Sequence, residues 1–249
     1  MALEALIFDV DGTLAETEEL HRCAFNESFQ TFGLSWVWQP DLYRELLQVT
    51  GGKERIRHYI ARYAPPGGAM ALARFGELHA EKTRRYGALI SRDLLKPRPG
   101  VARLLREARA AGIKLAIATT SDPANVAALL KASFDPDAPS WFSVIGAGDI
   151  VAAKKPAPDV YLWVLGHLGC DPSRAIAIED SENGLRAARA AGLKVVVTPG
   201  FYTDTDDFSR ASAVLSDLGE PDAPSRRLDG AGTSDRLVDL PFLRDVILR

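Results

Sequence analysis

Short, strongly hydrophobic runs recur along this chain, and their spacing constrains its fold more than any other feature. They cover residues 5–8, 115–119, 142–145, 175–178 and 195–198. Amphipathic helical stretches separate the last four runs. Strands that alternate with helices are typical of a parallel sheet whose strands are joined by crossover helices. We therefore predict an α/β fold with a Rossmann-like parallel-sheet core.

This alternation is interrupted after the first hydrophobic run. Residues 17–32, 41–48, 53–63 and 69–89 show helical spacing, with no strand-like run between them. Turn-forming residues flank the stretch, in D-G-T at 11–13 and K-P-R-P-G at 96–100. We therefore predict an all-helical cap domain at residues 17–96, inserted into a core formed by residues 1–16 and 97–249.

The C-terminal part of the chain follows neither pattern. A string rich in proline, glycine and charge follows Leu218 and predicts an irregular linker. The final L-P-F-L-R-D-V-I-L predicts a short helix that docks on the core.

Composition narrows the class of function. The 249 residues are 47% hydrophobic and 25% charged, and no apolar run approaches the ~20 residues of a membrane-spanning helix. The formal net charge of −3 gives no basic field for nucleic acid, and two cysteines without metal spacing exclude a disulfide framework and a structural zinc site. We expect a monomer that acts on small molecules, with no membrane or nucleic-acid partner. We expect it in the cytoplasm, or in a plastid if a transit peptide has been removed.

Polar side chains follow four of the predicted strands. Asp9 and Asp11 end the first one, and their spacing of two points both carboxylates to the same side. The groups after the other strands are Thr119-Thr120-Ser121, Lys154-Lys155 and Glu179-Asp180. Each group alone also suits a strand exit, a helix cap or a solvated lysine. Because the carboxyl ends of parallel strands form one ligand-binding edge, we expect all of them in one site.

Four acids at one edge of a sheet would repel each other unless a cation lay among them. These acids are Asp9, Asp11, Glu179 and Asp180. A site made of oxygen ligands beside a phosphate suits Mg²⁺. The sequence therefore predicts a magnesium cofactor.

In order along the chain, D-V-D-G-T, the strand ending in Thr119, Lys155-Pro156 and Glu179-Asp180 resemble the four motifs of the haloacid dehalogenase superfamily. The helical insertion resembles the C1-type cap of that superfamily. The resemblance implies that Asp9 is a nucleophile that forms an aspartyl-phosphate. It also implies that Asp11 is the general acid for the leaving alcohol and then the base for water.

The resemblance also implies roles for the remaining motif residues. Mg²⁺ would be held by a carboxylate oxygen of Asp9, the backbone carbonyl of Asp11, and Asp180, with Glu179 in or near its shell. Lys155 would supply a second cation. Further contacts to the phosphoryl oxygens would come from Thr119 and from the backbone N–H groups of Thr120 and Ser121.

The core motifs handle only the phosphoryl group, so we expect the cap to select the leaving alcohol. The cap candidates for substrate binding are Glu18, His21, Tyr43, Gly51, Gly52, Lys53 and Arg55. The candidates for a second phosphate are Lys53, Arg55, Arg98, Ser121 and Lys154.

Several longer strings resemble a narrower group within the superfamily. T-G-G-K-E-R-I, A-T-T-S, K-K-P-x-P-D-V-Y and E-D-S-x-N-G-L-R-A-A together resemble the CbbY-type subgroup. That resemblance implies a phosphatase for xylulose 1,5-bisphosphate, which clears an inhibitory side product of Rubisco. Three alternatives stay open: a phosphosugar mutase similar to β-phosphoglucomutase, a broad sugar-phosphate phosphatase, and a non-catalytic regulator that binds sugar phosphates. The intact pair of Asp9 and Asp11 speaks against the regulator.

Overall fold

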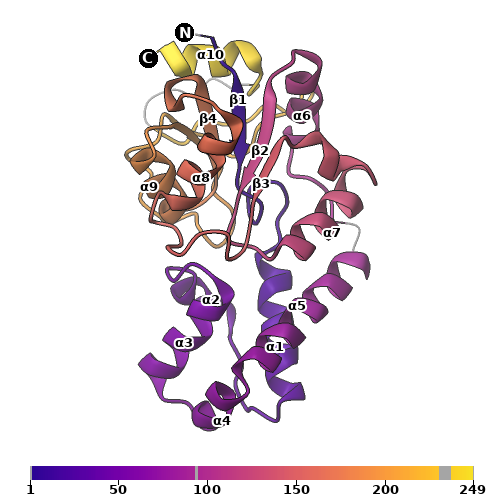
Figure 1. The fold of residues 1–249 in the computed structure, drawn as a ribbon, viewed down its shortest axis with the longest axis vertical. Coiled ribbons are helices and arrows are strands. Elements are labelled where there is room, and N and C mark those ends of the chain that lie inside the picture. Colours follow the sequence, from indigo (N-terminus) through magenta and orange to yellow (C-terminus); the bar gives the residue numbers. More distant parts are fainter. Residues whose placement is uncertain (1, 93–94, 230–236, 249) are drawn as a thin grey trace.

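The computed structural model describes residues 2–92, 95–229 and 237–248, and the strands within them form one parallel sheet (Figure 1). Its order is β3-β2-β1-β4-β5-β6. The strands are β1 (Ala5–Phe8), β2 (Lys114–Ala118), β3 (Val144–Gly146), β4 (Ala175–Glu179), β5 (Lys194–Val197) and β6 (Ala213–Val214). The first strand lies in the middle, where Leu6 pairs with Leu115 on one side and Ile176 on the other. The predicted α/β parallel sheet is confirmed.

Helices cover both faces of this sheet, because alternate residues of each strand point to opposite sides. The helices of the core are α6 (Val101–Ala110), α7 (Pro123–Ser133), α8 (Asp159–Leu168), α9 (Glu182–Ala190) and α10 (Leu240–Leu248). Phe8 and Ile178 pack on the side of α6, α7 and α10, whereas Ile7 and Ala177 pack on the side of α8 and α9. The two buried faces leave the carboxyl edge of the sheet as the place for polar groups.

A purely helical segment follows β1, and we call its elements α1–α5 the helical region. They are α1 (Glu18–Thr31), α2 (Pro40–Leu46), α3 (Gly52–Tyr63), α4 (Gly68–Ala73) and α5 (Phe75–Arg92). This region lies beyond one end of the sheet and has its own apolar cluster, which includes Phe25, Trp38 and Ile56 (Figure 1). Tyr202, from the loop after β5, belongs to the same cluster. A core loop is therefore packed into the helical region.

Some predicted element boundaries were wrong. The helix predicted at 69–89 is two helices, because Arg74 between them has φ −112° and ψ 28°. A 3₁₀ helix, η1 (Ala138–Trp141), precedes β3, which therefore starts two residues later than predicted. The two-residue β6 was not predicted, because so short a strand has no pattern of its own and forms only by pairing with β5. The cap boundaries at 17 and 96 stay a prediction.

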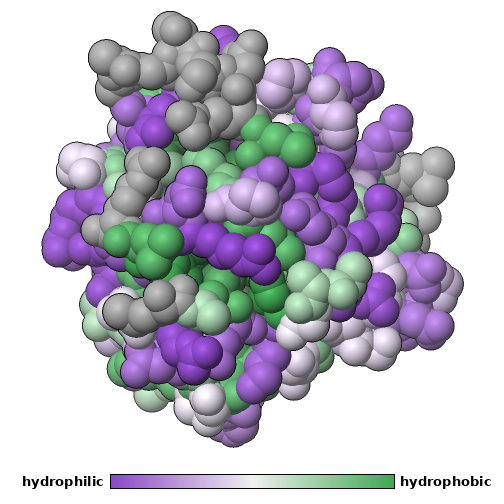
Figure 2. Space-filling view, turned by 90° about the horizontal axis from the view of Figure 1, so that it is seen from above, coloured by the Kyte–Doolittle hydropathy of each residue, from purple (hydrophilic) through white to green (hydrophobic). Residues whose placement is uncertain are grey.

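The C-terminal helix docks as predicted, with Leu243 and Ile247 of α10 buried against the sheet. In the linker predicted after Leu218, Arg227 forms a bridge with Leu215 outside it, and Glu220 forms one with Ala223; residues 230–235 lie outside the described part. Seen from the α10 end, hydrophobic residues gather among hydrophilic ones on the surface (Figure 2). This end is opposite the helical region, so α10 does not reach the carboxyl edge of β1 (Figure 1). None of the described helices is long and apolar enough to cross a membrane.

Candidate active site at the carboxyl edge of the sheet

The chain reverses directly after β1, and this turn places two carboxylates at the edge of the sheet. Asp9 follows Phe8, the last residue of the strand, and is 8% exposed. Gly12 has a φ of +79°, and the carboxylate of Asp180 lies where a Cβ on Gly12 would be. Only glycine suits both the backbone angle and this close approach. The turn therefore brings the ends of β1 and β4 together.

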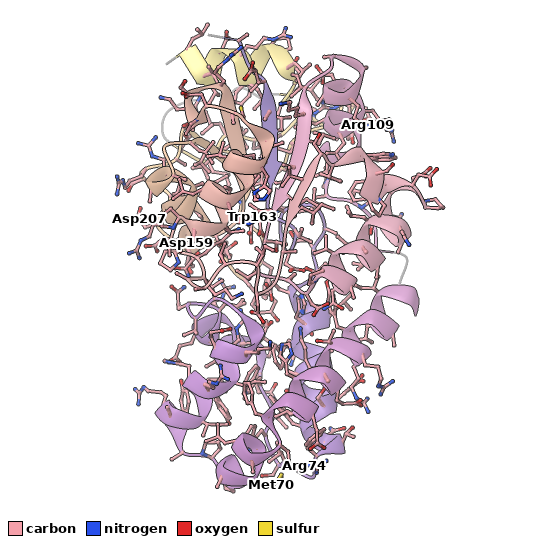
Figure 3. The ribbon with its side chains drawn as sticks, viewed as in Figure 1. Met70, Arg74, Arg109, Asp159, Trp163 and Asp207 are labelled. Atoms are coloured by element: carbon pink, nitrogen blue, oxygen red, sulfur yellow. The ribbon has the colours of Figure 1, made fainter. Side chains whose placement is uncertain are left out.

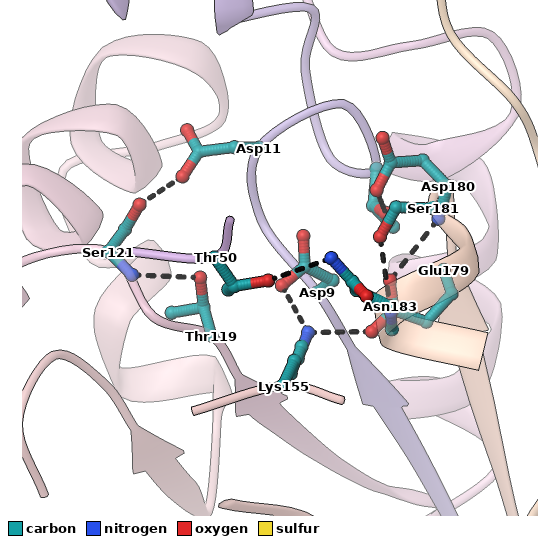
Figure 4. Close-up of polar contacts among 12 residues, drawn as sticks. Asp9, Asp11, Thr50, Thr119, Ser121, Lys155, Glu179, Asp180, Ser181 and Asn183 are labelled. Atoms are coloured by element: carbon teal, nitrogen blue, oxygen red, sulfur yellow. Dashed lines mark hydrogen bonds and ion pairs between the residues drawn. The ribbon is translucent and has the colours of Figure 1, made fainter. Parts of the chain in front are cut away.

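A buried lysine joins the ends of these two strands (Figure 4). Nζ of Lys155 lies 2.6 Å from Oδ1 of Asp9 and 2.6 Å from Oε1 of Glu179. Tyr161 donates its hydroxyl to the same oxygen of Glu179. Burial acts to lower the pKa of Lys155, but the charges of Asp9 and Glu179 outweigh it and raise that pKa. Lys155 is therefore a fixed cation in the site.

Three acids form a buried group of oxygen ligands beside this lysine. Carboxylate oxygens of Asp9, Glu179 and Asp180 all lie within 4.8 Å of one another. Burial raises the pKa of Asp9 to about 7. Burial, followed by the charge of Asp9, also raises the pKa of Asp180. This excess of negative charge and the oxygen donors fit a hard divalent cation such as Mg²⁺.

The carboxylate of Asp11 lies outside that group and accepts four hydrogen bonds. Thr17 Oγ1 donates at 2.5 Å, Tyr86 Oη at 3.2 Å and Ser121 Oγ to the second oxygen. Nε2 of His21 lies 3.0 Å away. Burial acts to raise the pKa of Asp11, but His21 and the hydroxyl donors outweigh it, and that pKa is lowered. In this arrangement Asp11 is ionised.

A second buried lysine fixes His21, and no sequence pattern indicated this contact. Nζ of Lys82 lies 2.5 Å from Nδ1 of His21, and the ring of Tyr86 stacks on the imidazole at 3.8 Å. Burial, and then Lys82, lowers the pKa of His21. A neutral imidazole that accepts from Lys82 at Nδ1 donates from Nε2 to Asp11. Lys82 therefore supports Asp11 through His21, and Tyr86 supports it by its own hydrogen bond. Both residues are distant from Asp11 in the sequence.

Two cavities meet at Asp11. They lie between the helical region and the sheet, where polar side chains gather (Figure 3). The smaller cavity has a volume of about 80 Å³, and the predicted catalytic residues Asp9, Asp11, Thr119 and Lys155 line it. The larger cavity has a volume of about 290 Å³. Of the predicted substrate-binding residues, the larger cavity is lined by Glu18, His21, Gly51, Gly52, Lys53, Arg55, Thr120, Ser121 and Lys154. Met70 and Arg74 lie at the far tip of the helical region (Figure 3).

Tyr43 is the exception among the predicted substrate-binding residues. Its side chain is fully buried and lines neither cavity, because its ring packs in the apolar cluster of the helical region. Its hydroxyl donates to Oε2 of Glu18 at 2.8 Å and accepts from Nη1 of Arg55 at 3.0 Å. Tyr43 thus connects two residues that line the cavities.

Arg98 was predicted as a ligand for a second phosphate, and this prediction was wrong. The guanidinium is buried and donates to the backbone carbonyls of Thr198 at 2.6 Å, Pro199 at 2.9 Å and Ser216 at 3.1 Å. It also donates to the carbonyl of Gly12. Arg98 lines neither cavity, because its donors tie the turn after β1 to the loops after β5 and β6.

Two of the predicted phosphate ligands share one acid at the mouth of the larger cavity. Nζ of Lys53 and Nζ of Lys154 each lie 2.7 Å from a carboxylate oxygen of Asp149. Hydrogen bonds from Lys154 and then Lys53 lower the pKa of Asp149 to about 2. Because Lys53 comes from α3 and Asp149 from the core, this ion pair spans the cleft.

Comparison with known proteins extends over most of the chain. A family model for haloacid dehalogenase-like hydrolases matches residues 3–192. The protein CbbY of Cereibacter sphaeroides is 50% identical over 218 residues, which are 88% of this chain and 94% of that protein. The crystal structure of CbbY from Rhodobacter sphaeroides in complex with phosphate is 50% identical, with a TM-score of 0.81, over 88% of this chain and 96% of that one. A mutant of that CbbY in complex with xylulose 1,5-bisphosphate is 49% identical and has the same TM-score of 0.81 and the same coverage of both chains.

Proposed function

This chain belongs to the haloacid dehalogenase-like hydrolases, and from that premise we propose that it is a magnesium-dependent phosphatase that hydrolyses xylulose 1,5-bisphosphate. The observation that carries the proposal is the pair of cavities that meet at Asp11. The smaller one contains the Asp9–Lys155 pair and suits a reacting phosphoryl group. The larger one carries cations for the rest of a bisphosphate. A CbbY at 49% identity binds this same sugar bisphosphate.

Asp9 is the proposed nucleophile, because a carboxylate needs no base to activate it once it is ionised. Lys155 fixes one of its oxygens, which leaves the other to attack phosphorus. The new bond gives an aspartyl-phosphate while the bond from phosphorus to the leaving alcohol breaks. Water then attacks the aspartyl-phosphate and releases inorganic phosphate.

Asp11 is the proposed proton carrier in both steps. The leaving alcohol needs a proton, and the attacking water must lose one. To act as a base, Asp11 must be ionised, and its four hydrogen-bond donors favour that state. As an acid it must first take up a proton, which requires substrate to displace a donor such as Ser121.

The acids beside Asp9 are the proposed metal ligands. We assign Mg²⁺ to Asp9, Asp180 and the backbone carbonyl of Asp11, with Glu179 at the edge of the site, where it is bonded to Lys155. When bound, Mg²⁺ would neutralise negative charge on the transferring phosphoryl group. Without Mg²⁺, Lys155 would still contact two of these acids, Asp9 and Glu179.

The second phosphate of the substrate is assigned to the cations of the larger cavity. Lys53, Arg55 and Lys154 line it together with the hydroxyl of Ser121. Charged donors of this kind form the strongest hydrogen bonds to phosphate. A phosphate between Lys53 and Lys154 would compete with Asp149 for both ammonium groups.

The test is phosphate release from a panel of phosphosugars that includes pentulose bisphosphates, with p-nitrophenyl phosphate as a small substrate. Lys53→Ala and Arg55→Ala should lower kcat/KM for the bisphosphate by about ten- to a hundredfold and leave the small substrate nearly unchanged. Arg84→Ala is the control, since Arg84 is an exposed cation of the helical region that is paired with Glu81. Equal losses for both substrates would contradict the second phosphate site. Release of a rearranged monophosphate would identify a mutase instead.

A further inference from the structure

One residue of the core holds the loop of the helical region that passes over the site. Asn183 is the second residue of α9, three positions after Asp180. Its Nδ2 donates to the backbone carbonyl of Gln48 at 3.0 Å and to Oγ1 of Thr50 at 3.1 Å. Asn183 and Thr50 line the smaller cavity together with Asp9 and Lys155, and Figure 4 draws the bond between them. The helix that follows a proposed metal ligand is thus bonded to the helical region.

We call residues 48–53, which are the loop before α3 and the first two residues of that helix, the crossing loop, because the core holds it at both ends. Asn183 holds Gln48 and Thr50, and Asp149 holds Lys53 at the other end by an ion pair. Thr50 lines the smaller cavity, whereas Lys53 lines the larger one. A shift of this loop would therefore change the walls of both cavities at once.

The side chain of Asn183 is not needed to begin its own helix. Ser181 is the N-cap of α9, and its hydroxyl accepts from the backbone N–H of Gly184 at 3.2 Å. The backbone N–H of Glu182 donates to the carboxylate of Asp206 at 2.9 Å. The two described hydrogen bonds of the Asn183 amide go instead to the crossing loop, so its side chain holds that loop.

We infer that Asn183 is a positioning residue for substrate, which sets the crossing loop over the two cavities relative to the strand end at Asp180. This inference rests on the proposed function. The short amide holds Thr50 by its hydroxyl and Gln48 by its carbonyl, so both the position and the rotation of the loop are fixed. Loss of the amide would leave two described side-chain contacts of this loop with the core, the ion pair of Lys53 with Asp149 and the 3.4 Å bond from Nε2 of Gln48 to Asp206.

The test compares Asn183→Ala and Thr50→Val with two controls. Thr50→Ser keeps the hydroxyl that Thr50→Val removes, and Arg186→Ala changes an exposed residue of α9 that is paired with Glu182. Asn183→Ala should lower kcat/KM for the sugar bisphosphate roughly tenfold, equivalent to about 1.4 kcal/mol, mainly through KM. Hydrolysis of p-nitrophenyl phosphate should fall by a smaller factor, because this substrate meets the loop only at Thr50 in the smaller cavity and does not use Lys53 in the larger one. Thr50→Val should add little in the Asn183→Ala background, because both variants remove the same bond.

Hydrogen exchange gives a readout that does not depend on activity. Backbone amides of residues 48–53 should exchange faster in Asn183→Ala and Thr50→Val than in the native protein, Thr50→Ser or Arg186→Ala. Native exchange rates in Asn183→Ala would overturn the inference, and so would equal losses of activity on the two substrates. If the native enzyme does not hydrolyse sugar bisphosphates, the proposed function fails, while the exchange measurement still decides whether Asn183 holds the loop.

Discussion

Nζ of Lys155 lies 2.6 Å from Oδ1 of Asp9, and both side chains are buried at the carboxyl end of β1. The same ammonium lies 2.6 Å from Glu179, so one cation serves two acids. Removal of one partner from a buried ion pair leaves an uncompensated charge, which is costly in a medium of low dielectric constant. The carboxyl edge of the sheet therefore depends on Lys155 for stability as well as for the chemistry proposed above.

Lys155→Met should destabilise the protein by about 3–5 kcal/mol, because it leaves Asp9 and Glu179 without their shared cation. Urea denaturation of the metal-free protein measures this change. The loss should be smaller with Mg²⁺ present, since a bound cation offsets part of the same charge. A variant as stable as the native protein would show that this pair contributes nothing to folding.

Asp9→Asn should abolish turnover and leave the fold intact, because an amide cannot attack phosphorus. Asp11→Asn should slow the reaction by about 10²–10⁴-fold, as expected for lost acid–base catalysis, and leave Mg²⁺ binding largely in place. Phosphate release, circular dichroism and metal titration separate these effects. More than trace activity in Asp9→Asn would remove that residue from the nucleophile role, and complete loss of metal affinity in Asp11→Asn would contradict the proposed division of labour.

Mg²⁺ should raise the Tm of chelator-treated protein in a concentration-dependent way, because it relieves repulsion among Asp9, Glu179 and Asp180. A ligand at a hundred times its Kd stabilises the folded state by about 2.7 kcal/mol. Ca²⁺ should also stabilise the protein but support little turnover, because its coordination is longer and less regular. Full activity after chelation would show that the reaction needs no metal.

Tyr43→Phe should raise KM for the sugar bisphosphate and destabilise the protein by about 1–3 kcal/mol, because Glu18 and Arg55 each lose a buried hydrogen-bond partner. Steady-state kinetics and urea denaturation test both effects. Tyr59→Phe is the matched control, since Tyr59 packs in the same aromatic cluster but does not bond Glu18 or Arg55. The two variants should differ, and identical behaviour would reduce Tyr43 to a packing residue.

Lys82 should make stability depend on pH in the alkaline range. Burial lowers the pKa of Lys82 to about 8, from an ordinary value of 10.5. Between these two values the unfolded chain binds more protons at this residue, so the free energy of unfolding rises with pH. Lys82→Met should lack this part of the rise. Urea denaturation of both proteins below and above the interval measures it, and a constant difference between them would mean that the pKa of Lys82 is not lowered.

The parallel sheet and its carboxyl edge could be predicted from sequence patterns. Hydrophobic runs and helical spacing reflect local backbone geometry and burial, so β1 and β4 could be located from neighbouring residues alone. The spacing of two between Asp9 and Asp11 is also a local feature, and it predicted that both carboxylates point to the same side. Parallel topology then requires the ends of the strands to meet, which is why Lys155 and Glu179 could be assigned to one site before any contact was known.

The hydrogen-bond donors that contact these groups became known only from the folded structure. Lys82 reaches His21 across 61 positions, and Asn183 reaches Thr50 across 133. No local pattern encodes such contacts, because the first joins two helices of the helical region, α1 and α5, and the second joins that region to the core. Packing within the helical region buries Tyr43 away from the cavities, and the loops of the core turn Arg98 toward backbone carbonyls, although both have side chains that suit a substrate. A residue's chemistry is set by its type, but its partners are set by how distant elements dock.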